Sequence, residues 1–353
     1  MPMLDIGSLI IEKAIDKGSI PGACWALVTK AGPTFYGHAG MRRLVPDKMP
    51  VAEDTLYDMA SCTKVVATTT MALQLIEQGR MSLKTRLSDI LTDFPHPEVT
   101  IGHIMTHTSG ICHDDKAYKA YKGERQIWDF FKDKPLEFAP GTNLVYSDFG
   151  YVALGLAIEK MVEAPLDVYA REHIFQPLAM NETGYRPADR GLASRCAATE
   201  VTADRGIICG EVHDGKAWRL DEISGNAGLF STTHDLARFV RMMLNDGSLD
   251  GAHVLSPTTI GLLKRCYTEG LPSRRTLGWI VGDRTAAMGD YYSDHCLFHT
   301  GFSGTSIYID FDRGCGVILL TNRIHPRRDN DAIMDLRNRF HNTVLLAWDQ
   351  AQR

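Results

Sequence analysis

The stretch Ser61-Cys62-Thr63-Lys64 decides how the rest of the chain is interpreted. Positions i and i+3 are neighbours on a helix, so the hydroxyl of Ser61 and the amine of Lys64 share one face. Such a lysine takes the proton of the serine, provided that its amine is neutral when a substrate arrives. The apolar run that follows, ending at Gly79, predicts a buried central helix with Ser61 at its N-terminal end.

The same four residues also have a purely structural interpretation. A serine often caps a helix, and a lysine is usually solvated. For Lys64 to act as a base, its pKa must fall from about 10.4 through burial among apolar residues or through a nearby cation. We interpret Ser61 as a nucleophile and Lys64 as its base because two further motifs follow, and we interpret Cys62 as a packed thiol.

Two later triplets supply the companions that such a site needs. Tyr146-Ser147-Asp148 precedes an apolar helical run over residues 149–158, and His299-Thr300-Gly301 ends a predicted strand. A second Tyr-Ser-Asp triplet at residues 292–294 leads into a strand with no helix after it. Order and context therefore favour the triplet at Tyr146.

These three motifs, in this order, resemble those of the penicillin-recognising serine hydrolases. The resemblance is to the branch of class C β-lactamases, family VIII carboxylesterases and low-molecular-mass penicillin-binding proteins. Residues 106–110, 228–232 and 319–323 are similar to other segments of that family, so the resemblance runs from about Gly22 to the last helix. It implies an antiparallel sheet flanked by helices, an all-helical second domain, and an active site in the cleft between them.

The resemblance also implies roles for individual residues. Tyr146 would be the catalytic partner of Ser61 and Lys64, and the N–H of Phe302 would complete an oxyanion hole with the N–H of Ser61. The family needs no cofactor for this chemistry. The other residues expected at the substrate are His299, Thr300, Gly301, Asp148, Ala227 and Arg327.

Three positions depart from the family pattern. Asp148 replaces the commoner asparagine, and its charge would raise the pKa of Lys64 unless the carboxylate points away. His299 replaces a lysine that would supply a permanent charge for a substrate carboxylate. Ala227 stands where related lactamases carry an aromatic residue, which suggests an open acyl pocket. The departures at His299 and Ala227 favour an esterase or amidase over a β-lactamase.

The distribution of apolar patterns predicts an α+β fold. We expect strands at residues 23–30, 34–38, 276–281, 295–300, 305–310 and 315–321, and helices at 6–14 and 331–348. Because strands lie towards both ends of the chain, we predict one sheet domain from residues 1–79 and 216–353. Residues 80–215 would form an inserted, mostly helical domain.

Composition excludes several classes of partner. A net charge of −5 argues against binding to nucleic acid or to an anionic membrane. No stretch approaches 18 consecutive apolar residues, and residues 1–20 lack the apolar core of a signal peptide. The eight cysteines occur singly, so we expect reduced thiols in a cytoplasmic protein. A presequence removed from this chain would overturn that expectation.

We therefore predict a serine hydrolase that forms an acyl-serine intermediate, most readily a carboxylesterase on small esters with weak β-lactamase activity. The expected partner is a small ester, amide or β-lactam; the oligomeric state is left open. A D-amino-acid or muropeptide amidase or peptidase is the first alternative, and a non-catalytic binding protein with the same fold is the second. 

A metallohydrolase is the third alternative. His103 and His107 lie at i,i+4 spacing, as in some zinc sites, with His113, Asp114 and Asp115 nearby. Position 104 holds isoleucine, however, where the zinc-protease motif would carry glutamate. We therefore expect no metal.

Overall fold

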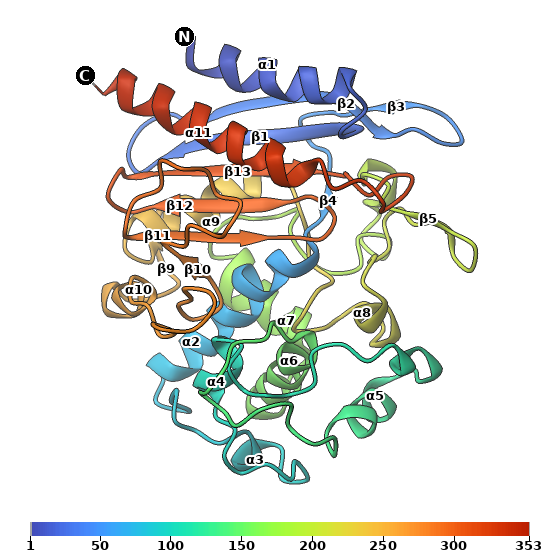
Figure 1. The fold of residues 1–353 in the computed structure, drawn as a ribbon, viewed down its shortest axis with the longest axis vertical. Coiled ribbons are helices and arrows are strands. Elements are labelled where there is room, and N and C mark those ends of the chain that lie inside the picture. The colour runs from blue at the N-terminus through green and yellow to red at the C-terminus, as the bar shows by residue number, and fades with distance from the viewer. Residues whose placement is uncertain (1, 353) are drawn as a thin grey trace.

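An antiparallel sheet built from both ends of the chain lies in the upper half of the molecule in Figure 1. The computed structural model describes residues 2–352. The seven strands lie in the order β10-β11-β12-β13-β1-β2-β3. They are β1 (Gly22–Thr29), β2 (Phe35–Arg43), β3 (Met49–Pro50), β10 (Ile280–Val281), β11 (Cys296–Thr300), β12 (Ser306–Asp310) and β13 (Cys315–Thr321). The predicted pairing of early and late strands is confirmed, because β1 runs antiparallel to β13.

Both faces of this sheet are covered, which explains why its strands are continuous apolar runs. Every residue of β1 is buried. Cys24 and Ala26 belong to one hydrophobic cluster together with residues of α9 (Thr233–Leu244). Trp25 and Leu27 belong to a second cluster on the opposite face. The alternation along β1 therefore holds two separate layers of the core together.

Two helices from opposite ends of the chain cover the second face. The helices α1 (Pro2–Asp16) and α11 (Ile333–Ala351) pack against each other, and Figure 1 shows α11 crossing in front of β1 and β13 with α1 above it. Ile11 of α1 and Phe340 of α11 pack in the same cluster as Trp25. The predicted terminal helices are confirmed: α1 extends beyond both predicted ends, whereas α11 begins and ends slightly later than predicted.

The remaining helices lie mostly below the sheet in Figure 1. The predicted central helix begins with a 3₁₀ turn, η1 (Ala60–Cys62), continues as a π-helical turn, η2 (Lys64–Thr68), and ends as α2 (Thr69–Glu77). The other helical elements are α3 (Leu87–Ile90), α4 (Ile101–Met105), η3 (Lys116–Ala120), α5 (Glu124–Phe131), α6 (Asp148–Val162), α7 (Leu166–Ala170), η4 (Arg171–Phe175), η5 (Ala193–Arg195), α8 (Gly215–Arg219) and α10 (Pro257–Leu263). We propose residues 80–215 as the inserted helical domain.

Short two-stranded sheets lie outside the seven-stranded sheet. They are β4 (Tyr57–Asp58) with β7 (Phe230–Ser231), β5 (Val201–Thr202) with β6 (Gly206–Ile207), and β8 (Ser248–Leu249) with β9 (Ala252–His253). The β4–β7 pair matters most for function, because β4 leads directly into the turn that carries Ser61.

One predicted strand is largely wrong. Only Ile280 and Val281 of the expected strand 276–281 pair with β11. Gly278 has a φ of 79°, which breaks the extended backbone, and its N–H donates to the carbonyl of Met105 instead. Separately, no helix within residues 2–352 combines the length and the apolar character needed to cross a membrane.

The contact between Gly225 and α6 gives a test of this packing. A Cβ on Gly225 would overlap the carbonyl oxygen of Tyr151 in α6. We expect Gly225→Ala to lower the free energy of unfolding by about 1–3 kcal/mol, measured by urea denaturation. Gly261→Ala is the matched control: it lies in α10 with open space around it, and it should raise stability by about 0.5–1 kcal/mol. Equal effects of the two substitutions would contradict the packing described here.

Candidate active site

The turn before Ser61 is strained and is held by a buried carboxylate. Ala60 has a φ of 45°, which non-glycine residues rarely adopt. The Oδ1 atom of Asp58 accepts a hydrogen bond from the N–H of Ala60 at 2.8 Å, and Oδ2 accepts one from the N–H of His213 at 2.7 Å. Burial raises the pKa of Asp58 despite these donors. Sequence reasoning missed Asp58, because a single aspartate before the motif carries no pattern.

The amine of Lys64 is fully buried and makes three hydrogen bonds. Its Nζ atom lies 3.0 Å from the Oγ of Ser61, 2.8 Å from the Oδ1 of Asp148 and 2.9 Å from the carbonyl oxygen of Asn226. An ammonium group has three N–H donors and no acceptor. The surroundings of Lys64 therefore match its protonated form.

This arrangement corrects the prediction that Lys64 is neutral at rest. Burial alone would lower the pKa of Lys64, but the carboxylate of Asp148, and after it Tyr146, raise that pKa above its ordinary value. The departure from asparagine at position 148 has the effect anticipated for a carboxylate that faces the lysine. In the resting site, Lys64 is an ammonium ion that must lose a proton before it can act as a base.

Asp148 contacts Lys64 on the side away from the substrate cavity. Contrary to the prediction, it is not among the residues that line this cavity. It begins α6, and the preceding Ser147 caps that helix by accepting the N–H of Gly150 at 3.0 Å. The second carboxylate oxygen of Asp148 lies 3.3 Å from the Nζ of Lys216. Burial would raise the pKa of Asp148, but Lys64 and Lys216 together lower it. No motif in the sequence pointed to Lys216.

Tyr146 completes the group of three predicted catalytic side chains. The Nζ of Lys64 lies 4.9 Å from the centre of the Tyr146 ring. The Tyr146 hydroxyl is buried and has no hydrogen-bond partner within residues 2–352. His107 holds this segment in place, because its Nδ1 accepts the N–H of Ser147 at 3.2 Å and its ring packs 4.2 Å from that of Tyr146.

The third motif is tied to the turn that carries Ser61. A Cβ on Gly301 would overlap the carbonyl oxygen of Met59, so only glycine fits this approach. The hydroxyl of Ser303 donates to the carbonyl of Asp58 at 2.7 Å. Within the described chain, the N–H of Phe302 donates no hydrogen bond. This geometry is compatible with the predicted oxyanion hole.

A cavity of about 400 Å³ opens in front of Ser61. It is lined by Ser61, Tyr146, Arg275, Ile280, His299, Thr300, Gly301, Phe302, Arg323, Asp331, Ile333, Met334 and Arg337. Arg275 is buried, and its Nε and Nη1 have no hydrogen-bond partner among the residues described. Arg337 donates to the carbonyls of Gly301 and Thr305, and burial lowers its pKa to about 10, so it stays charged at neutral pH.

Two predicted substrate-binding residues lie elsewhere. The side chain of Arg327 is 78% exposed and lies 3.6 Å from Asp329, so it is a solvated surface residue. Ala227 is buried in a small hydrophobic cluster with Leu56 and Phe230, and it does not line the cavity. Arg275 and Arg337 occupy the cavity instead. Neither arginine belongs to a motif, so neither could be chosen from the sequence alone.

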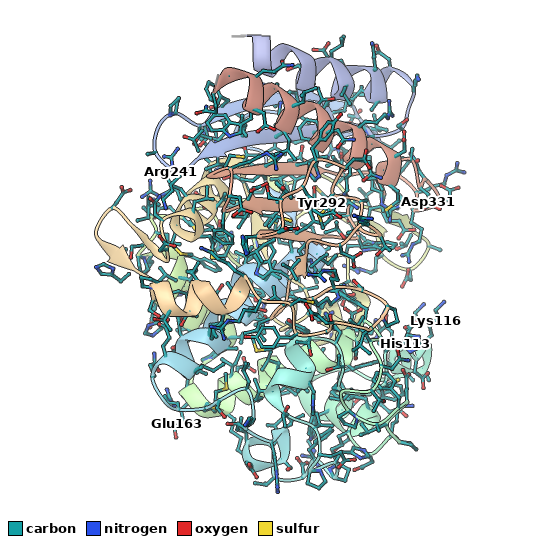
Figure 2. All side chains as sticks on the ribbon, turned by 60° about the vertical axis from the view of Figure 1, so that its left-hand side comes forward. His113, Lys116, Glu163, Arg241, Tyr292 and Asp331 are labelled. Carbon is teal, nitrogen blue, oxygen red and sulfur yellow. The ribbon has the colours of Figure 1, made fainter. Side chains whose placement is uncertain are left out.

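The histidines of the metallohydrolase alternative have separate structural roles. The Nδ1 of His103 accepts the N–H of Thr100 and so helps to cap α4. His107 binds the backbone of Ser147, as described above, and His113 pairs with Glu137 at 2.8 Å. Figure 2 shows His113 on the surface of the helical region. Within residues 2–352, no three metal-binding side chains of the His, Cys, Asp or Glu type come together.

The second Tyr-Ser-Asp triplet is also structural. The hydroxyl of Ser293 donates to Asp310 at 2.8 Å, and Tyr292 packs against the hydrophobic cluster between the sheet and α11. Tyr292 lies over the sheet in Figure 2. Among the cavity-lining residues, the tyrosine is Tyr146, in agreement with the interpretation from sequence.

The buried state of His299 predicts a pH effect on stability. Burial, together with Arg275 and Lys64, holds the pKa of His299 well below its usual value, so the folded protein keeps it neutral. The unfolded chain takes up this proton below about pH 6.5, which costs up to about 1.4 kcal/mol per pH unit of acidification. We expect the loss of unfolding free energy between pH 7.5 and 5.5 to be smaller in His299→Gln than in the original protein. An unchanged loss in urea titrations would contradict a neutral, buried His299.

Comparisons with known proteins agree with this geometry. The family model described as "Beta-lactamase" matches residues 9–338. The chain is 32% identical to an N-acetylmuramyl-L-alanine amidase of Bacillus subtilis (strain 168), covering 90% of this chain and 80% of the relative. It is 31% identical to a putative D-alanyl-D-alanine carboxypeptidase of Salmonella agona (strain SL483), covering 77% and 70%.

A solved structure shows the same fold. Simvastatin synthase from Aspergillus terreus, as a LovD6 mutant, superimposes with a TM-score of 0.79 at 21% identity, covering 99% of this chain and 98% of that one. Similarity at this level of identity concerns the fold alone. The family match over nearly the whole chain is decisive: this protein belongs to the β-lactamase family and is a serine hydrolase of the superfamily that includes the penicillin-binding proteins.

Proposed function

We propose that this hydrolase cleaves an amide bond in small substrates that carry a carboxylate, such as peptide fragments of peptidoglycan. The observation that carries the proposal is the position of Arg275. Its guanidinium lines the same cavity as Ser61, is buried, and has two nitrogens without partners among the described residues. A buried charge without a partner is costly, and a carboxylate bound in the cavity would supply the missing countercharge.

The charge of the cavity supports an anionic substrate. The sequence favoured an esterase or amidase over a β-lactamase because His299 lacks the permanent charge of lysine, and the lowered pKa of His299 agrees with a neutral ring. Arg275 and Arg337, however, bring permanent charge to the same cavity. Arg323 and Asp331 also line the cavity and lie 3.5 Å from each other as an ion pair. The positive charge of Arg275 and Arg337 is therefore not neutralised by Asp331. 

The names of the relatives support the same class of substrate. One is an N-acetylmuramyl-L-alanine amidase and another is a putative D-alanyl-D-alanine carboxypeptidase. Both names describe cleavage of an amide bond. We therefore place the amidase or peptidase alternative ahead of the carboxylesterase predicted from the sequence.

In the proposed reaction, Ser61 is the nucleophile. Lys64 first loses a proton to water in the cavity, and it then takes the hydroxyl proton of Ser61 while Oγ attacks the carbonyl carbon. The N–H groups of Ser61 and Phe302 stabilise the oxyanion that forms, an effect worth about 2.7–4 kcal/mol for one donor. The tetrahedral intermediate collapses, and the leaving amine takes a proton through the Tyr146 hydroxyl. Water then hydrolyses the acyl-serine by the same route and releases the acid.

Cleavage of small esters remains a second candidate. The steps are the same with an alcohol as the leaving group, and the apolar side chains of Ile280, Phe302 and Met334 at the cavity would contact an acyl chain. A protein that binds such molecules without turning them over would leave Ser61 unacylated. Acylation of Ser61 therefore separates both hydrolases from the non-catalytic alternative.

We retain the cytoplasm as the proposed compartment. The eight thiols are free, and six of them are buried. Disulfides are rare in compartments that keep thiols reduced. A small molecule remains the proposed partner.

The test of this function compares two forms of one substrate. We expect a D-alanyl-D-alanine peptide with a free carboxylate to be cleaved faster than the same peptide ending in an amide. Arg275→Met should raise KM for the acidic peptide by about tenfold to a hundredfold, corresponding to about 1.4–2.8 kcal/mol, and should change the turnover of p-nitrophenyl acetate much less. Arg275→Lys, which keeps a charge, should retain part of the preference.

Two controls complete this experiment. Arg327→Met alters an exposed arginine outside the cavity and should leave the preference intact. Ser61→Ala should abolish turnover of both peptides and of p-nitrophenyl acetate, together with labelling by a fluorophosphonate. Turnover that survives in Ser61→Ala, or an Arg275→Met variant that loses all substrates equally, would overturn the proposal.

A further inference from the structure

A second lysine shares the carboxylate that binds Lys64. Oδ1 of Asp148 lies 2.8 Å from the Nζ of Lys64, and Oδ2 lies 3.3 Å from the Nζ of Lys216. The side chain of Lys216 is 8% exposed, and that of Asp148 is 23% exposed. The two amines thus bind opposite oxygens of one carboxylate in a largely desolvated place. None of the sequence motifs includes Lys216.

The catalytic cycle makes this second cation important. At rest, Lys64 neutralises Asp148. When Lys64 gives up its proton, Asp148 loses one of its two cationic partners, and without Lys216 it would be a buried anion with no partner, which is a costly state. The ion pair between Lys216 and Asp148 remains at that moment.

We infer that Lys216 is a positioning residue that keeps Asp148 charge-paired while Lys64 is neutral, and so makes the basic form of Lys64 accessible. The inference rests on the proposed acyl-serine route, in which Lys64 accepts the proton of Ser61. Lys216 acts through Asp148 and touches neither the substrate cavity nor Ser61.

The groups around Lys216 keep it cationic. Asp148 faces it from α6, Asp114 lies 3.8 Å away in the loop before η3, and Asp214 caps α8 from the adjoining turn. The rings of Tyr118 and Phe149 lie 5.0 and 5.3 Å from its Nζ. Burial lowers the pKa of Lys216, but Asp148 and Asp214, with Tyr118, raise it above its ordinary value.

The groups around Lys64 are different in kind. Its ammonium contacts the Ser61 hydroxyl and the Asn226 carbonyl, and Asp148 is its only salt bridge among the described residues. The rings of Tyr146 and Tyr151 lie 4.9 and 5.7 Å away. When Lys64 loses its proton, the main electrostatic change is therefore that Asp148 loses one of its cationic partners.

The residue type at position 148 provides an internal test. A neutral asparagine, common in the resembling family at this position, has no charge that would need a second cation. If Lys216 acts through the charge of Asp148, it should matter in the original protein and become nearly dispensable in Asp148→Asn. 

The experiment measures the rate of Ser61 labelling by a fluorophosphonate between pH 6 and 9, with intact mass spectrometry as the readout. We expect Lys216→Met to slow labelling at pH 7 by about tenfold or more and to move the rise in rate to higher pH, one pH unit for each tenfold. Lys216→Arg should restore the rate to within about threefold. In the Asp148→Asn background, Lys216→Met should change the rate by less than about threefold.

A matched control is Lys132→Met, because Lys132 is also largely buried and pairs with Asp133 at 2.9 Å outside the site. It should leave the pH profile unchanged. A Lys216→Met variant whose labelling rate falls by the same factor in both backgrounds would overturn the inference and indicate a purely structural role. So would a variant with no loss at all.

The outcomes also separate this inference from the proposed function. The fluorophosphonate carries no carboxylate, so the labelling experiment still tests the role of Lys216 if the proposed substrate class is incorrect. Failure of Ser61 in the original protein to react would overturn both proposals, because both require a reactive serine.

Discussion

The ion pair between Lys64 and Asp148, 2.8 Å long, is the interaction on which the site depends. It joins the turn after Ser61 to the start of α6, and it sets the hydroxyl of Ser61 and the amine of Lys64 3.0 Å apart. Removal of Asp148 would leave the buried ammonium of Lys64 without a salt-bridge partner among the described residues. Asp148 positions the amine of Lys64 and also keeps it protonated. Catalysis, in contrast, requires the neutral amine.

The fold positions these groups by bringing together segments that are far apart in sequence. The sheet takes strands from both ends of the chain, which brings Gly301, at the end of β11, against the strained turn at Ala60. Asp58 holds that turn on one side, and the loop carrying Asn226 approaches Lys64 on another. The strain at Ala60 is maintained because the surrounding contacts leave the turn no alternative conformation.

Residues within motifs could be predicted from the sequence, whereas their partners could not. Ser61, Lys64, Tyr146 and His299 lie together, and each could be predicted because it belongs to a recognisable motif. Asp58, Lys216 and Arg275 are single charged residues whose importance comes from burial, which no local pattern reveals. Arg327 and Ala227 were wrongly placed at the substrate for the same reason: their positions in the chain said nothing about the direction of their side chains.

The most direct measurement of the central claim is the pH dependence of Ser61 acylation in the original protein. Lys64 must lose a proton from an ammonium whose pKa Asp148 holds above its ordinary value. The account therefore predicts a rate of p-nitrophenyl acetate acylation that still rises about tenfold per pH unit up to about pH 9. A rate that is already constant below about pH 7 would show that Lys64 is neutral at rest and would contradict the account.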